Sequence, residues 1–461
     1  MPKNNKILVI GGGPGGYTAA FRASELGAEV TLVDKDKSLG GACLNYGCIP
    51  SKTLLHAAKI IFEAKVAESF GIKLSGPVID LNGLRQFKEK TIAKLNNGLA
   101  FVCRQKKVIY INGEARFTGS NSVTVSSDGK LQDLSFDKAI IAAGSKPIPF
   151  PGVDFGGNVW DSALALNIEE APNDLLIIGG GYIGLELGTV YAALGSKVTL
   201  VEMAEEIIPG VDEDLTKILK KRLKNLFAQI FVNAKISGID KNTDKVTVTI
   251  TDKDGNQAKK EFDKVLASIG RMPEAKNLGL EKTKVTLSEK GFIKINERLQ
   301  TSDSSIYAVG DITGNPLLAH KASMQGKIAA EVICGLDSKF SPKSIPGCIY
   351  TDPEIAVCGL SESEAKLKGI EVKVLSLPWI ASGKATTLDR TDGLTKILVN
   401  SYTKKIVGAG IVGVGASELI YGINMAVENS LTIGQYQKYI HPHPTLSETL
   451  LDTAWMFKDG D

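Results

Sequence analysis

The chain has 461 residues and a net charge of +3, with 43% hydrophobic and 23% charged residues. This length exceeds what one hydrophobic core usually holds, so two to four domains are expected. Basic and acidic residues are interspersed and apolar runs are short, so we expect a globular protein that binds neither nucleic acid nor a membrane.

The first predicted elements are a strand, a turn, a helix and a second strand. Residues 7–10 form the apolar run of a buried parallel strand, residues 11–16 form a glycine-rich turn, and Gly27 ends the helix before the strand 30–33. The turn and the end of the second strand carry a dinucleotide-binding fingerprint, Gly11, Gly13, Gly16 and Asp34. These glycines allow a tight turn and close approach to a pyrophosphate, and the carboxylate binds the adenosine ribose.

Two of the six cysteines, at positions 43, 48, 103, 334, 348 and 358, stand apart from the others. The set as a whole forms neither a secreted disulfide framework nor, with four histidines, a zinc site, so no metal is expected. Cys43 and Cys48 are spaced to close a small loop just after the fingerprint. The helix that opens near Pro50 would put Cys48 at its N-terminus, which favours a thiolate. We predict a disulfide that exchanges electrons with a bound cofactor.

The same order of elements returns about 170 residues later. Residues 175–178 predict a strand, a helix runs toward Leu194, and residues 198–202 predict the next strand. The second fingerprint consists of Gly179, Gly181, Gly184 and Glu202. Glu202 suits a free ribose hydroxyl, and residues 203–208 contain no arginine for a 2′-phosphate, so NAD is favoured over NADP. Two dinucleotides with a dithiol between them in sequence imply FAD as the relay between NAD and sulfur.

The remaining segments predict a long helical stretch over 51–107, short strands over 108–137 and a stiff linker at 147–152. Further breaks are expected near residues 270–273 and 341–347. Residues 347–461 alternate strands and helices without a fingerprint and predict a separate α+β domain. The predicted fold class is therefore α/β, with two Rossmann-like dinucleotide-binding domains and a C-terminal α+β domain.

Four motifs carry a family resemblance over essentially the whole chain. They are residues 40–52 around the cysteine pair, residues 301–311 ending in Val-Gly-Asp, residues 318–322 (Leu-Ala-His-Lys-Ala) and residues 441–448 (His-Pro-His-Pro-Thr-Leu-Ser-Glu). With them the chain resembles the flavin-dependent pyridine nucleotide–disulfide oxidoreductases, and within these the dihydrolipoyl dehydrogenase branch. The resemblance implies an FAD-binding domain at 1–146, an NAD-binding domain at 147–270, a central domain completing the FAD site at 271–346 and a dimerisation domain at 347–461.

The resemblance implies an enzyme that oxidises protein-bound dihydrolipoamide to lipoamide and reduces NAD⁺. Cys43 and Cys48 would be the redox disulfide, His443 the base and Glu448 the residue that orients its ring. His443 ranks ahead of His441 because only His443 directly precedes Pro-Thr. Pro444 suggests a cis bond after His443.

The cofactor contacts implied by the resemblance fall on both fingerprints and on scattered positions between them. FAD, bound tightly but non-covalently, would contact Gly11, Gly13, Gly16, Asp34, Lys52, Ala115, Gly144, Asp311 and Ala319. NAD would contact Gly179, Gly181, Gly184, Glu186, Glu202 and Gly270. Lys52 and Glu186 are expected to form an ion pair beside the flavin.

The implied partners are a second copy of the chain and a lipoyl-bearing protein. His443 would serve the cysteine pair of the other subunit in a homodimer. The lipoyl group would be carried by an acyltransferase of a 2-oxo acid dehydrogenase complex or by the H-protein of glycine cleavage. With no signal or transit segment expected, the location would be the cytoplasm, or the mitochondrial matrix if a transit peptide had been removed.

The nearest alternative is a glutathione- or trypanothione-type reductase, which should carry arginines after the second fingerprint. A mercuric reductase would need extra C-terminal cysteines, and a large thioredoxin reductase a C-terminal redox pair. A catalytically silent structural subunit of a multienzyme assembly is a further alternative. A yellow protein that dihydrolipoamide reduces would exclude the silent subunit.

Overall fold

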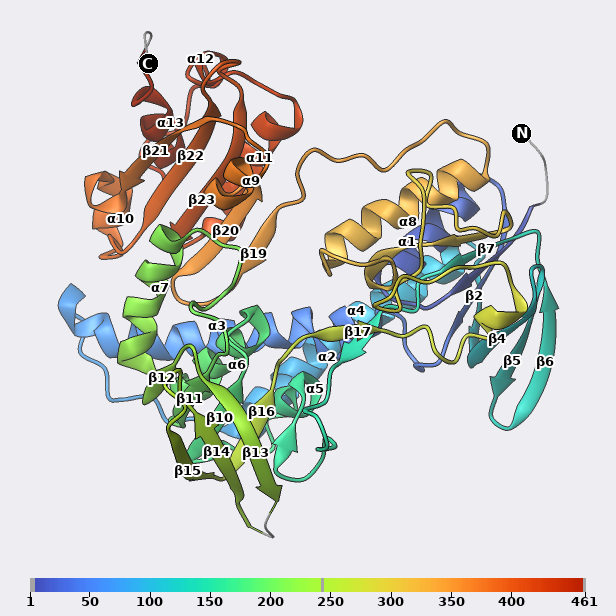
Figure 1. The fold of residues 1–461 in the computed structure, drawn as a ribbon, viewed down its shortest axis with the longest axis horizontal. Helices are drawn as coiled ribbons and strands as arrows, with labels where there is room; N and C mark the ends of the chain where they lie inside the picture. The colour runs from blue at the N-terminus through green and yellow to red at the C-terminus, as the bar shows by residue number, and fades with distance from the viewer. Residues whose placement is uncertain (1–4, 242–243, 459–461) are drawn as a thin grey trace. The chain divides into compact units, whose positions relative to one another are not determined.

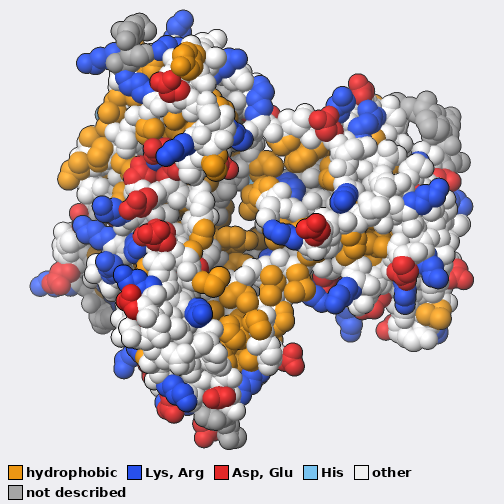
Figure 2. Space-filling view, viewed as in Figure 1, with side chains coloured by type: hydrophobic (Ala, Val, Ile, Leu, Met, Phe, Trp, Pro, Cys, Tyr) orange, Lys and Arg blue, Asp and Glu red, His pale blue; other side chains and the backbone are white. Residues whose placement is uncertain are grey.

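The computed structural model describes residues 5–241 and 244–458, which fall into two compact units (Figure 1). The first unit comprises the chain up to Thr53, Asn82–Ile148 and Gly270–Ser341, and the second comprises Leu54–Leu81, Pro149–Ile269 and the chain from Pro342 onward. On the face drawn in Figure 2, basic and acidic side chains are interspersed on both units. Among the described helices, none is long and apolar enough to cross a membrane. The division into four domains stays a prediction.

The first unit is built on a parallel sheet of five strands in the order β18-β7-β1-β2-β3. Its strands are β1 (Lys6–Ile10), β2 (Glu29–Asp34), β3 (Ile109–Asn112), β7 (Lys138–Ile141) and β18 (Ile306–Ala308). Helices α1 (Pro14–Glu25) and α8 (Ala319–Ile333) lie against each other beside this sheet (Figure 1). Their backbones approach so closely that a Cβ on Gly326 would lie 2.2 Å from the carbonyl oxygen of Gly15.

Two smaller sheets complete the first unit. Strands β4 (Glu114–Gly119), β5 (Ser122–Ser127) and β6 (Lys130–Ser135) form an antiparallel sheet whose apolar side chains share a core with the parallel sheet. Strands β8 (Ser145–Pro147) and β17 (Arg271–Pro273) pair antiparallel where the chain leaves the unit and returns to it. The predicted linker and the predicted break at 270–273 therefore begin as paired strands. Short 3₁₀ helices η2 (Leu280–Lys282) and η3 (Gly310–Thr313) follow.

The helical stretch predicted over 51–107 is interrupted. The structure has α2 (Gly41–Tyr46), α3 (Cys48–Val66), η1 (Ala67–Phe70) and α4 (Leu81–Gln105). Gly71 ends η1 with a left-handed φ of 79°, and residues 72–80 have no regular structure. A glycine in this conformation is a common helix stop.

The second unit contains a second parallel sheet, in the order β12-β11-β10-β16-β9. Its strands are β9 (Val159–Trp160), β10 (Asp174–Ile178), β11 (Lys197–Val201), β12 (Gln229–Phe231) and β16 (Lys264–Ala267). The connecting helices are α5 (Ser162–Leu166), α6 (Tyr182–Ala193) and α7 (Glu213–Leu226). An antiparallel sheet of β13 (Lys235–Lys241), β14 (Val246–Thr251) and β15 (Gln257–Phe262) packs on it through a shared apolar core.

The C-terminal part of the second unit is α+β. Its antiparallel sheet, ordered β19-β20-β23-β22-β21, consists of β19 (Gly347–Ile349), β20 (Glu354–Gly359), β21 (Val372–Pro378), β22 (Leu394–Asn400) and β23 (Ile406–Gly413). The helical segments are α9 (Glu362–Leu367), η4 (Trp379–Ala381), α10 (Gly383–Thr387), α11 (Ala416–Glu428), α12 (Ile433–Tyr436) and α13 (Glu448–Trp455). Trp379 is fully buried, and its indole N–H donates to the Thr395 hydroxyl at 2.9 Å.

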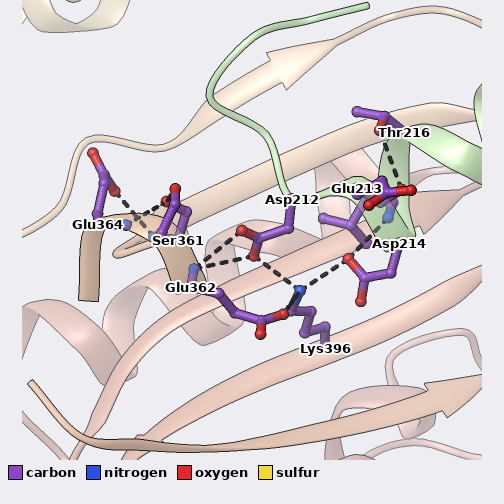
Figure 3. A network of polar contacts seen from close by, with 10 residues as sticks. Asp212, Glu213, Asp214, Thr216, Ser361, Glu362, Glu364 and Lys396 are labelled. Carbon is purple, nitrogen blue, oxygen red and sulfur yellow. Dashed lines mark hydrogen bonds and ion pairs between the residues drawn. The ribbon is translucent and has the colours of Figure 1, made fainter. Parts of the chain in front are cut away.

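A buried lysine joins this sheet to helix α7 (Figure 3). The Lys396 side chain is 0% exposed, and its Nζ lies 2.9 Å from carboxylate oxygens of both Asp212 and Asp214 and also pairs with Glu362. Burial alone would lower the pKa of Lys396, but the three carboxylates outweigh it and raise the pKa. Among the described residues, Asp212, Asp214 and Glu362 are the one group of three acidic side chains close enough together to hold a metal ion. Nζ of Lys396 pairs with all three.

Candidate active site

The two cysteines of the predicted redox pair lie beside each other in the first unit. Cys43 is on α2, and Cys48 is the first residue of α3, at the helix terminus that the sequence predicted. Both are reduced thiols, with Cys48 exposed and Cys43 half-buried. The hydrogen bond to Cys48 raises the pKa of the Cys43 thiol, burial raises it further, and the positive charge of Lys52 opposes this.

The start of helix α2, which carries Cys43, is in direct backbone contact with the first fingerprint. The N–H of Gly40 donates to the carbonyl of Gly12 at 2.8 Å. Gly41 has a φ of +54°, and a Cβ there would lie 2.6 Å from Cα of Gly13. Only glycine fits this conformation and this contact without strain. The backbone contact fixes the position of the dithiol relative to the dinucleotide loop.

The first fingerprint has the donor set that a dinucleotide requires. Gly13 is the N-cap of α1 and provides no capping side chain, so the first-turn N–H groups are left available to an anion. Asp34 is 8% exposed and accepts hydrogen bonds from the N–H groups of Gly12 and, at 2.8 Å, Asp36. Burial raises the pKa of Asp34, and these two N–H groups offset part of the rise. A carboxylate retains further lone pairs for ribose hydroxyls, so the residues fit an adenine dinucleotide.

The second fingerprint repeats this geometry in the second unit. Glu202 accepts hydrogen bonds from the N–H of Gly180 at 2.5 Å and of Ala204 at 2.6 Å. Gly181 caps α6 without a capping side chain, and a Cβ on it would find no atom of the described residues within 4 Å. The loop is therefore open to a ligand at the position where a pyrophosphate approaches.

The other predicted FAD positions are distributed over the first unit. Lys52 is on α3, Ala115 is buried in β4, and Ala319 is the first residue of α8. Asp311 lies in η3, and Gly144 has a φ of +74° just before β8.

Two predicted NAD positions lie outside the fingerprint of the second unit. Gly270, with a φ of +125°, precedes β17, so it falls in the first unit, where its carbonyl accepts the N–H of Ile148 at 3.0 Å. Glu186 is 3% exposed and accepts the N–H of Tyr350 at 3.0 Å. Its expected ion pair with Lys52 stays a prediction, because the two residues belong to different units.

Sequence reasoning missed two residues beside Asp311. The Ser145 hydroxyl lies 2.6 Å from Oδ2 of Asp311, and Nε of Arg271 lies 2.8 Å from the same hydroxyl. Ser145 lies just before the predicted linker at 147–152, and Arg271 lies in the predicted break at 270–273. The one available signal was a charged residue, Arg271, inside an otherwise apolar and glycine-rich break.

The predicted base is in the second unit with its partner. Nδ1 of His443 lies 2.9 Å from Oε1 of Glu448, the first residue of α13, and the His443–Pro444 bond is cis. The N–H of Thr445 donates to the other Glu448 oxygen at 2.8 Å. These two contacts, the backbone one first, hold the pKa of Glu448 below its usual value. His441 instead packs edge-on against Tyr436 at a centroid distance of 5.9 Å.

Comparison with known proteins extends these observations. Two similar curated proteins are called dihydrolipoyl dehydrogenase. One, from Vibrio parahaemolyticus, is 42% identical over 454 residues, covering 98% of this chain and 95% of the relative. The other, from Buchnera aphidicola, is 45% identical over 456 residues, covering 98% and 96%. The structure of the HOCl-induced flavoprotein disulfide reductase RclA from Escherichia coli matches with a TM-score of 0.87 at 28% identity, covering 98% of this chain and 100% of that chain.

The predicted fold class is confirmed by the sheets and by these matches. Residues 5–326 match the model of the pyridine nucleotide-disulphide oxidoreductases, and residues 345–454 match the dimerisation domain of the same proteins. The first match contains both fingerprints and the cysteine pair, and the second contains His443 and Glu448. The chain belongs to the pyridine nucleotide-disulphide oxidoreductase family.

Proposed function

We propose that the chain oxidises protein-bound dihydrolipoamide to lipoamide and transfers the two electrons to NAD⁺. The observation that carries this proposal is the dithiol of Cys43 and Cys48, joined by backbone contacts to a dinucleotide-binding loop. The similarity over nearly the whole chain to proteins called dihydrolipoyl dehydrogenase supports the choice of substrate.

FAD is the cofactor of the first fingerprint and NAD that of the second. The buried Asp34 and the covered loop fit a cofactor that stays bound, and the open loop at Gly181 fits one that exchanges. When bound at the first fingerprint, FAD would supply the two-electron chemistry that links the dithiol to NAD⁺. Glu202 favours the unphosphorylated ribose, and residues 203–208 offer no arginine to a 2′-phosphate.

The sulfur chemistry proceeds by two exchanges. A substrate thiolate attacks Sγ of Cys43 in the oxidised pair, the Cys43–Cys48 bond breaks, and Cys48 leaves as a thiolate. The second substrate sulfur then attacks the first, which forms the lipoamide disulfide and releases Cys43. Both substrate protons are lost, and the pair is left with the two electrons.

His443 is the base that removes a proton from the substrate thiol. Glu448 holds Nδ1 of the ring, so Nε2 faces outward to act. His443 is 81% exposed in the single chain. The domain that carries it matches a dimerisation domain and presents exposed apolar side chains, among them Tyr421, Met425, Tyr439, Ile440 and Trp455. We therefore place the base opposite the cysteine pair of a second copy, in a homodimer whose substrate is carried by a lipoyl-bearing acyltransferase or H-protein.

The test is to mix purified protein with dihydrolipoamide and NAD⁺ and to follow NADH. We expect rapid turnover, complete loss in Cys48→Ser, and a loss of about 10²- to 10⁴-fold in His443→Gln, the usual range for a general base. His441→Gln is the matched control, because that ring packs on Tyr436 rather than on Glu448, and it should keep its activity. NADPH-driven reduction of glutathione disulfide without dihydrolipoamide oxidation would refute the proposal.

A further inference from the structure

Asp311 has an ordered polar environment drawn from three distant parts of the first unit. Its own segment is η3, whereas Ser145 is in β8 and Arg271 in β17, the two strands through which the chain leaves the unit and returns. The Ser145 side chain is buried, and Asp311 is half-buried. This convergence has no counterpart in either fingerprint.

The hydrogen atoms in this group can be assigned from chemistry alone. Nε of Arg271 donates to Oγ of Ser145 at 2.8 Å, and a second guanidinium nitrogen donates to the Ser145 carbonyl at 2.6 Å. A guanidinium has donors only, so Ser145 Oγ must be the acceptor in the first contact. The single hydroxyl proton of Ser145 is then free to point to Oδ2 of Asp311 at 2.6 Å.

The orientation of Asp311 follows from that chain of donors. Ser145 engages Oδ2, and the described residues give no other side-chain hydrogen bond to Asp311. Oδ1 is therefore available to accept a hydroxyl from a ligand. A second cation stands nearby: Lys321 is 5% exposed and donates to the Gly314 carbonyl at 2.5 Å. Burial lowers the pKa of Lys321, and the charge of Asp311 offsets part of that.

We propose that Ser145 and Arg271 are positioning residues that fix the Asp311 carboxylate so that one oxygen binds a hydroxyl of the FAD polyol chain. This inference rests on the proposed function, in which FAD occupies the first unit. The hydrogen bonds from Arg271 to Ser145 and from Ser145 to Asp311 form a relay that begins on β17 and passes through β8. Cofactor binding therefore depends on the two paired strands that connect the unit to residues 149–269. The position of the cofactor thus depends on the β8–β17 strand pair as well as on the first fingerprint.

The test measures the FAD dissociation constant of full-length apo-protein by flavin fluorescence. Ser145→Ala should raise this constant about tenfold, since a hydrogen bond to a charged group is lost. Ser145→Thr retains the hydroxyl and should restore binding. The matched control is Ser120→Ala, because the Ser120 hydroxyl makes a similar 2.5 Å bond to Asp303 in the same unit, outside the relay. It should lower the melting temperature but leave FAD affinity unchanged.

A double-mutant cycle isolates the relay. Asp311→Asn should weaken FAD binding more than S145A does, and adding S145A to D311N should cause no further loss. Arg271→Lys, which keeps the charge but loses the fork of donors, should behave as S145A does. Additive losses in the cycle, no effect of S145A, or failure of S145T to restore binding would overturn the relay. Wild-type apo-protein that binds no FAD would instead overturn the proposed function.

Discussion

The two dinucleotide-binding folds share one plan but are completed by different parts of the chain. In each, a strand–helix–strand unit is followed by a third parallel strand, an antiparallel three-stranded sheet and a fourth parallel strand. The fifth strand differs: β18 follows the whole second fold in sequence, whereas β9 precedes the first strand of its own fold. A repeated local pattern therefore does not determine which segment closes the sheet.

The folds also differ at the ligand-binding loop. Gly40 and Gly41 cover the first loop and bring the dithiol against it, whereas the second loop is uncovered at Gly181. Asp34 is buried, and its counterpart Glu202 is half-buried. The same fingerprint is therefore covered in one fold and open in the other, which agrees with the resident FAD and the exchanging NAD proposed for them.

The largest expected effect concerns the buried ion pairs by which Lys396 holds helix α7 of the second dinucleotide-binding fold to the C-terminal sheet. Lys396→Met leaves Asp212, Asp214 and Glu362 facing one another without a cation, so the free energy of unfolding should fall by about 3–5 kcal/mol. The matched control is Lys220→Met on the same helix α7, where the ion pair with Glu206 is partly exposed and should be worth about 1 kcal/mol or less. Denaturant unfolding measures both, and equal losses would contradict a special role for Lys396.

The pH dependence of this effect has a defined sign. The folded-state pKa of Lys396 is raised, so its contribution is fully present below the unfolded lysine pKa of about 10.4 and is lost as pH rises through the folded value. The difference between wild type and K396M should therefore be constant from about pH 7 to pH 9 and shrink only in stronger alkali.

The next effect concerns the cover over the first loop. Gly41→Ala forces a side chain into a left-handed conformation and against Gly13, so it should cost at least about 1–3 kcal/mol and release FAD. Gly27→Ala is the control, because its φ of +88° is also left-handed but a Cβ there meets no atom of the described residues within 4 Å. If G27A were as damaging as G41A, backbone strain alone and not the contact with the loop would be responsible.

The same comparison predicts a different result at the second loop. Gly181→Ala has an ordinary φ of −75° and open space, so stability should change little. The new methyl group would project to where the pyrophosphate approaches, so the KM for NAD⁺ should rise while FAD retention stays normal. An unchanged KM would argue against the pyrophosphate position assigned to this loop.

The smallest effect concerns the choice between NAD and NADP. Glu202→Ala removes the proposed acceptor for the ribose and should raise the KM for NAD⁺ about tenfold, with weaker discrimination against NADP⁺. Glu205→Ala is the control, since this exposed carboxylate lies on the same loop. Steady-state rates with both nucleotides provide the measurement, and an equal effect of E205A would indicate a general loss of charge.

Local sequence patterns predicted much of the site. The glycine spacing and the apolar runs gave both fingerprints, and α3 begins at Cys48, where the thiolate argument required it. The contact between His443 and Glu448 was also within reach of sequence, because the two are only five positions apart and a helix begins at Glu448. These features depend on short-range periodicity and on turn chemistry, which neighbouring residues carry.

Tertiary structure alone decided the contacts between distant segments. Ser145 and Asp311 are 166 positions apart, and Lys396 meets Asp214 across 182 positions. Neither pair leaves a periodic signal, because a single serine or lysine in a short strand is ordinary in isolation. The sequence by itself therefore determined which dinucleotides and which thiols the protein uses. The tertiary structure decided how Asp311 is held and how helix α7 is anchored, because only folding brings those distant groups together.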